Sequence, residues 1–118
     1  MTVSILGTEY EVIKKKVDED PYFDKRSYDG YCDSIEHKIV YCDMTTYRGW
    51  ENEPETRSAI AEKATLRHEI VHAFFNESGL QESTSLFEEG WAKNEEMIDW
   101  IAIQGPKIYK AWEEAGAV

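Results

Sequence analysis

The sequence predicts an α+β domain, in which a small antiparallel or mixed β-sheet packs on a long helix and on a C-terminal helix. The first half of the chain contains short runs of β-branched and aromatic residues, separated by Gly-containing turn signals. The second half differs, because residues 52–78 contain no Gly and further helical patterns follow them. A length of 118 residues suits one domain, so residues 1–118 are expected to fold as a single unit.

Four short segments of the first half are expected to be strands. The first two flank Gly7-Thr8, which predicts a hairpin. Residues 18–26 are acidic and contain Pro21, so we expect a loop there that can include one helical turn. Asp29-Gly30 is a further turn signal before the last two strands. The expected strands are Thr2–Leu6, Tyr10–Val17, Tyr31–Cys32 and Lys38–Met44.

The long helix is expected over Asn52–Ser78, with Pro54 in its first turn and Gly79 just past its end. Its apolar residues form two stripes on opposite sides, which is typical of a helix between two layers, here the sheet and the C-terminal helices. One stripe holds Ile60, Ala64, Val71 and Phe75, and the other holds Leu66, Ile70, Ala73 and Phe74. Glu69 lies on a polar flank between the stripes and is expected to face a cleft.

The rest of the chain is expected to contain one irregular segment and two helices. Gln81–Glu89 is polar, which favours irregular structure. A second helix is expected over Trp91–Ile103. The pair Gly105-Pro106 is expected to stop this helix and to start a short last helix over Lys107–Glu114.

The net charge of −11 argues against nucleic acid as a partner and against an anionic membrane surface. No apolar run approaches the roughly 20 residues that span a bilayer, and the N-terminus lacks the pattern of a signal peptide. A cytoplasmic protein is therefore expected, with Cys32 and Cys42 reduced. A cross-strand disulfide in an exported protein and two further metal ligands are alternatives, but the cysteines lack the short CxxC spacing of structural zinc sites.

The sequence His68-Glu69-Ile70-Val71-His72 is an instance of HExxH, a pattern in which one helix offers two imidazoles to a metal ion. A helix turns about 100° per residue, so residues four apart return to within roughly 40° of one another. His68 and His72 can therefore bind the same zinc ion. Glu69 lies beside the metal position, where it can accept a proton from water. The alternative is a pair of helix histidines with ordinary hydrogen bonds.

A catalytic zinc site takes three protein ligands and keeps one position open for water, so a third donor is needed. The acidic segment NEEMID supplies candidates. On a helix, Glu95 and Asp99 share one face, so one of them can reach the metal while the other accepts the N–H of a ligand imidazole. Glu96 points about 100° away and cannot serve together with Glu95. Glu88 and Glu89 are further alternatives for the third ligand.

The HEIVH motif followed by NEEMID resembles the gluzincin metallopeptidases, whose thermolysin-like pattern is HExxH and then NExxxD. The resemblance implies that His68, His72 and Glu95 bind zinc, with Glu69 as the general base and Asp99 behind a ligand imidazole. Its motifs cover roughly the second half of the chain, and the first half matches only in the order of elements. By size, the chain is most similar to the minimal gluzincins of bacteria and their phages, including the ImmA/IrrE-like proteins. A zincin-like fold is therefore expected.

The expected function is zinc-dependent hydrolysis of a peptide or protein substrate. Lys38–Met44 is expected to be the sheet edge that pairs with an extended substrate, the alternative being a plain structural strand. An oxyanion needs a donor besides zinc, for which His37, Tyr47 and Tyr109 are candidates. Two other classes of protein remain open: an interaction domain in which zinc only staples the helices, and an acidic binding or decoy protein.

Overall fold

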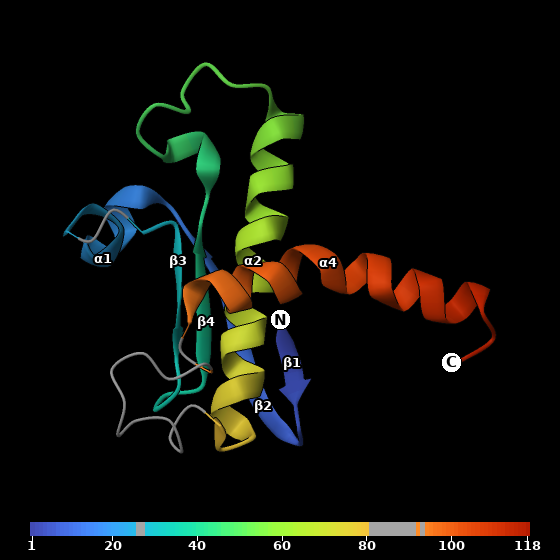
Figure 1. Cartoon of the computed structure of the whole chain (residues 1–118). Coiled ribbons are helices and arrows are strands. Elements are labelled where there is room, and N and C mark those ends of the chain that lie inside the picture. The colour runs from blue at the N-terminus through green and yellow to red at the C-terminus, as the bar shows by residue number, and fades with distance from the viewer. Residues whose placement is uncertain (26–27, 81–91, 93) are drawn as a thin grey trace.

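The computed structural model of the chain describes residues 1–25, 28–80, 92 and 94–118, and its architecture is α+β (Figure 1). A mixed four-stranded sheet has α2 packed on one face, and α4 crosses α2 so that its C-terminal half projects beyond the other elements (Figure 1). The strands are β1 (Thr2–Ile5), β2 (Thr8–Lys15), β3 (Gly30–Asp33) and β4 (Lys38–Cys42). The helices are α1 (Pro21–Lys25), α2 (Glu55–Glu77) and α4 (Glu95–Glu114), with 3₁₀ turns at Val17–Glu19 and Met44–Thr46.

The predicted N-terminal hairpin is confirmed, with its turn one residue earlier than expected. Ile5 pairs with Thr8, so the turn consists of Leu6 and Gly7. Both residues have positive φ, 48° and 89°, as a two-residue type I′ turn requires. Gly7 accepts this conformation at no steric cost, and Leu6 accepts it at an exposed position.

The order of strands in the sheet is β1-β2-β4-β3, with β2 and β4 parallel and the other two pairs antiparallel. The expectation that residues 38–44 form an open edge is therefore wrong, because β4 lies between β2 and β3. Ile39, Val40 and Cys42 are each at most 1% exposed, and such a run suits a strand that is covered on both faces. Among the described residues, β1 and β3 are the edge strands of the sheet.

The acidic segment after β2 forms the single helical turn α1, which Asp20 anchors from inside the protein. The carboxylate of Asp20 accepts hydrogen bonds from the backbone N–H of Tyr22, from the hydroxyl of Tyr31 and from Lys15, at 2.6–3.3 Å. Burial alone would raise the pKa of Asp20, but these three donors outweigh burial and lower the pKa below 3.8. The expected helical turn is present as α1, and the 3₁₀ turn at Val17–Glu19 is a second one that was not expected.

Helix α2 begins at Glu55, three residues later than expected. Pro54 precedes the helix with an extended backbone, and its carbonyl accepts from the N–H groups of Arg57 and Ser58. The residue before a proline is biased away from the helical region, which favours a helix start after Glu53. At the other end, Gly79 has φ 79° and follows the last turn as predicted.

One of the two apolar stripes expected on α2 is placed against the sheet. Leu66, Ile70 and Ala73 pack with a cluster formed by Ile5, Tyr10, Val12 and Ile39. The expectation of burial is wrong for Ile60, which is 69% exposed, and for Phe74, which is 40% exposed. For Ile60 the cause is that α4 crosses only part of α2 and leaves its N-terminal turns uncovered (Figure 1).

Helix α4 begins at Glu95, because Asn94 has an extended backbone and its side chain accepts from the N–H of Met97 at 2.9 Å. The expected start at Trp91 and the expected irregular segment 81–89 lie outside the described residues. The expected break at Gly105-Pro106 is wrong, since α4 continues to Glu114.

A contact from another helix accounts for this continuation. Pro106 has no N–H, so it leaves the carbonyl of Ala102 without its usual donor four residues on. Arg67 of α2 donates to that carbonyl through Nε at 3.2 Å.

Among the described helices, none has the length and apolar composition needed to cross a membrane.

Candidate metal centre

The two histidines of α2 point at the same place, as their spacing predicts. The Nε2 atoms of His68 and His72 lie 3.1 Å apart, and both side chains are about one-fifth exposed. Two neutral imidazoles at this separation present lone pairs toward one point.

Helix α4 brings Glu95 to the same point. Its carboxylate oxygens lie 3.0 Å from Nε2 of His68 and 3.3 Å from Nε2 of His72. With one ligand atom from each residue, the three donors lie within 4.8 Å of one another. Donors at about 2.0–2.1 Å from a tetrahedral zinc ion are separated by roughly 3.3 Å. The two imidazole nitrogens lie 3.1 Å apart, and each is close to a different oxygen of Glu95: Oε2 lies 3.0 Å from His68 and Oε1 lies 3.3 Å from His72. The group of donors is therefore close to the size of such a site.

Asp99, one turn after Glu95, contacts the other nitrogen of His68. Its Oδ1 lies 2.6 Å from Nδ1 of His68, so Nδ1 carries the proton and Nε2 keeps its lone pair for a metal. Glu96 is exposed and makes no ion pair with either histidine. The alternative ligands Glu88 and Glu89 lie outside the described residues.

Glu69 lies beneath this group of donors, against the start of β3. It is only 6% exposed, and its Cγ is 3.6 Å from where a Cβ on Gly30 would lie. Burial raises the pKa of Glu69 to about 7; nearby His68 lowers it, and the charges of Glu95 and Asp29 raise it. No residue in the described ranges donates a hydrogen bond to this carboxylate. Glu69 lines a cleft that also contains His68, His72 and Glu95.

The donors lie in an open cleft of about 640 Å³ between β3, α2 and the first half of α4. Among the described residues its charged lining is acidic, apart from Arg67. The acidic lining residues are Asp29, Glu69, Glu95 and Asp99. The cleft runs along an open sheet edge, as the binding site for an extended chain would.

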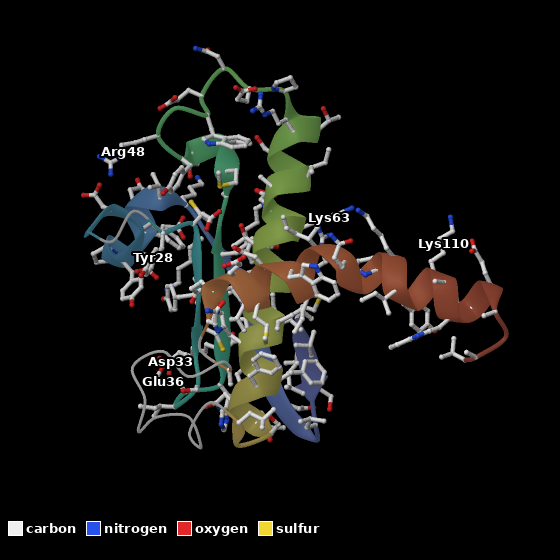
Figure 2. The ribbon with its side chains drawn as sticks, in the orientation of Figure 1. Tyr28, Asp33, Glu36, Arg48, Lys63 and Lys110 are labelled. Atoms are coloured by element: carbon white, nitrogen blue, oxygen red, sulfur yellow. The ribbon has the colours of Figure 1, made fainter. Side chains whose placement is uncertain are left out.

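None of the three residues expected to donate to an oxyanion lines this cleft. Tyr109 is 53% exposed on the projecting half of α4, and His37 lies 3.6 Å from Glu77 at the far end of α2. Tyr47 packs against a buried cluster on the other side of the sheet, formed by Phe23, Val40, Cys42 and Met44. Tyr28 does line the cleft, and Figure 2 shows it beside β3 at the end near α1. No pattern in the sequence singled Tyr28 out.

Two further residues of the site were recognised in the sequence only as a turn signal. The carboxylate of Asp29 accepts a hydrogen bond of 2.8 Å from the hydroxyl of Thr65. This bond connects the start of β3 to α2, the helix that carries His68 and His72. Gly30 follows, and a Cβ there would lie 2.5 Å from Cγ2 of Thr65 and 3.0 Å from the carbonyl oxygen of Val40. Gly30 is therefore needed for the close approach of β3 to α2.

Both cysteines are free thiols, as expected. The register pairs Cys32 with Ile39, so the cysteines are not opposite one another in the sheet. Cys32 lines the cleft, but burial, together with the charges of Glu69, Asp33 and Glu77, raises its pKa to about 12 and keeps it protonated. A protonated thiol is a poor metal ligand.

No protein-family model matches this chain, and neither the curated proteins nor the solved structures contain a significant match. The chemistry of the site must therefore be argued from its own geometry.

Proposed function

We propose that this chain is a zinc-dependent peptidase of the gluzincin type, in which His68, His72 and Glu95 hold the metal and Glu69 is the general base. The single observation that supports the proposal most is the convergence of three side chains: the Nε2 atoms of His68 and His72 lie 3.1 Å apart, and the two oxygens of Glu95 lie 3.0 and 3.3 Å from them. Two imidazoles and one carboxylate are also the ligand set of catalytic zinc sites that keep one position open.

The proposed roles of the side chains follow from their surroundings. When bound, zinc would polarise the scissile carbonyl and increase the acidity of water. Glu69 accepts a proton from the attacking water and passes it to the leaving amine, a role that suits a carboxyl group that lines the cleft directly beside the ligand His68. Asp99 holds the ring of His68 in the tautomer that leaves Nε2 free.

The substrate is proposed to bind along β3 rather than β4. The N–H of Cys42 donates to the carbonyl of Asp29, so residues 29, 31 and 33 direct their hydrogen-bonding groups toward β4. The intervening residues Gly30 and Cys32 direct theirs toward the open edge. An extended peptide at that edge would lie along the cleft that contains Glu69.

The proposal is tested by measuring zinc content and peptide cleavage in the same preparations. The expected result is one zinc per chain and cleavage of a peptide library, with Glu69→Gln abolishing cleavage but retaining zinc, and His72→Ala losing both. An active Glu69→Gln variant would contradict the assigned base.

The same experiment separates the other classes of protein. A chain that binds one zinc but cleaves nothing in the library, with or without Glu69, would be a domain that zinc only staples together. A chain that binds no zinc would be an acidic binding protein in which the HExxH pattern is fortuitous.

A further inference from the structure

Asn76 lies in the cleft of the metal site, one helical turn beyond His72. His68, His72 and Asn76 follow one another at four-residue spacing on α2, so their side chains lie on the same side of the helix. Asn76 is partly buried and lines the same cleft as the two histidines and Glu95. A polar side chain at this place can contact a molecule that binds at the metal.

Hydrogen bonds from inside the protein fix the orientation of the Asn76 amide. Its Nδ2 donates to the hydroxyl oxygen of Tyr10 at 3.2 Å and lies 3.5 Å from Oε1 of Glu77. Tyr10 is 0% exposed and donates its own proton to Oε1 of Glu77 at 2.7 Å. The hydrogen bonds from Tyr10 and Thr8 hold the pKa of Glu77 below its usual range, so the Glu77 carboxylate is an acceptor only.

The same contacts exclude the opposite orientation of this amide. A flipped Asn76 would direct Oδ1 at the lone pairs of Tyr10 and at the carboxylate of Glu77, and neither has a proton left to donate. Nδ2 therefore points inward, which leaves Oδ1 as the polar atom that Asn76 offers to the cleft. Within the part of the chain that the structure describes, no residue donates to Oδ1.

The position of Asn76 relative to the metal ligands matches an extended chain. β3 and α2 run side by side, and Cys32 of β3 packs against the core cluster that contains Ala73 of α2 (Figure 1). The four residues from His72 to Asn76 advance about 6 Å along the helix, and two residues of an extended chain advance about 6.8 Å. A peptide that pairs with β3 and crosses the metal site would therefore pass Asn76 about two residues from the bond over the metal.

We infer that Asn76 is a substrate-positioning residue, whose Oδ1 accepts a hydrogen bond from an N–H of the peptide about two residues from the scissile bond. The inference rests on the proposed function, because it takes the metal as the place of cleavage. A main-chain N–H and the N–H of a side chain present the same chemistry to an amide oxygen, so either can be the donor. Tyr10 acts only through Asn76, by keeping the amide from turning.

Three variants separate this role from a structural one. Asn76→Ala removes the acceptor and is expected to weaken binding about 5–30-fold, since it leaves a desolvated N–H of the peptide without a partner. Tyr10→Phe keeps the acceptor but frees the amide to turn, so a smaller loss is expected. Thr8→Val is the matched control: it removes another hydrogen bond to Glu77, of 2.9 Å, without touching Asn76, so it can lower stability but should leave binding unchanged.

The test is binding of two fluorescently labelled oligoalanine hydroxamates to the zinc-loaded full chain, measured by fluorescence anisotropy. One peptide carries the zinc-binding hydroxamate at its carboxyl end and the other at its amino end, so that they cover both sides of the metal. With one of them we expect the loss in Asn76→Ala, and an equal loss in the wild type when a single amide about two residues from the hydroxamate is N-methylated. The same N-methylation should then have little effect in Asn76→Ala, a coupling that a merely structural role would not produce.

The outcomes separate this inference from the proposed function. A loss confined to peptides in which one alanine is replaced by glutamine would assign the donor to a side chain. Binding of every probe within about twofold of the wild type in Asn76→Ala, an equal loss in Thr8→Val, or no binding of either probe to the zinc-loaded wild type at about 1 mM would overturn the inference. Library cleavage is scored separately: a chain that binds the probes as expected but cleaves nothing would refute the proposed peptidase and leave Asn76 as a peptide-binding residue.

Discussion

Replacing Arg67 with methionine is expected to loosen α4, because Arg67 donates to the carbonyl that Pro106 leaves without a helical partner. The bond from Nε of Arg67 to the carbonyl of Ala102 is 3.2 Å long and part-buried. Methionine keeps much of the apolar stem but cannot donate. Since Glu95 lies on the same helix as Ala102, the change should also weaken the metal site.

The magnitude follows from the cost of an unpaired carbonyl. Leaving a part-buried acceptor without a donor costs about 1–2 kcal/mol, which lowers the midpoint of urea unfolding by roughly 1 M. In a Pro106→Ala background, residue 106 regains an N–H that can donate to Ala102. Arg67→Met should then cost less than about 0.5 kcal/mol, so the two changes should show a coupling energy of about 1 kcal/mol.

The assay is urea unfolding of the four proteins of this double-mutant cycle, measured without metal so that Arg67 acts only on the fold. Lys63→Met is the control, since Lys63 is exposed one turn earlier on α2 and its loss should cost nothing in either background. If Arg67→Met costs the same with and without Pro106, Arg67 does not act through the carbonyl of Ala102 and the reasoning fails.

Three further predictions concern the site and the core. Asp99→Asn is expected to weaken zinc binding about 10–100-fold in a competitive chelator titration, whereas Glu96→Gln should leave it unchanged; equal losses would contradict the assigned contacts. Gly30→Ala should cost about 1–3 kcal/mol in urea unfolding, because its Cβ would lie 2.5 Å from Cγ2 of Thr65. Thr65→Ser removes that methyl group and should restore part of the loss, so a double variant no more stable than Gly30→Ala would count against this packing. Because the pKa of Asp20 lies below 3.8 in the folded chain, its ionisation stabilises the fold fully above about pH 4, and this contribution is lost as pH falls through the lower folded value. Asp20→Asn should therefore lower the urea midpoint at pH 6, and its effect should shrink progressively as the pH is lowered below 3.8; a constant difference would show that the charge of Asp20 is not responsible.

The parts of the site that depend on local geometry could be predicted from the sequence. The four-residue spacing of His68 and His72 on one helix is enough to bring their Nε2 atoms to 3.1 Å. The same spacing between Glu95 and Asp99 accounts for one reaching the imidazole nitrogens and the other reaching Nδ1 of His68. Only the meeting of the two helices depends on tertiary structure.

The errors lie where distant contacts override local signals. Pro106 breaks an isolated helix, but α4 continues because Arg67, almost forty residues earlier, satisfies the freed carbonyl. The strand order is equally non-local: nothing within Lys38–Cys42 indicates that β2 pairs with it in parallel and β3 on its other side. The role of Gly30 was hidden for the same reason, since the atom that it must avoid belongs to Thr65.

The central claim is that two imidazoles and one carboxylate hold a single zinc ion, and X-ray absorption at the zinc edge tests it most directly. The protein loaded with one zinc per chain should show four nitrogen or oxygen neighbours at about 2.0 Å, two of them with the outer-shell scattering of imidazole. A sulfur neighbour at about 2.3 Å would place the zinc on Cys32 or Cys42 instead, and the proposed site would be wrong.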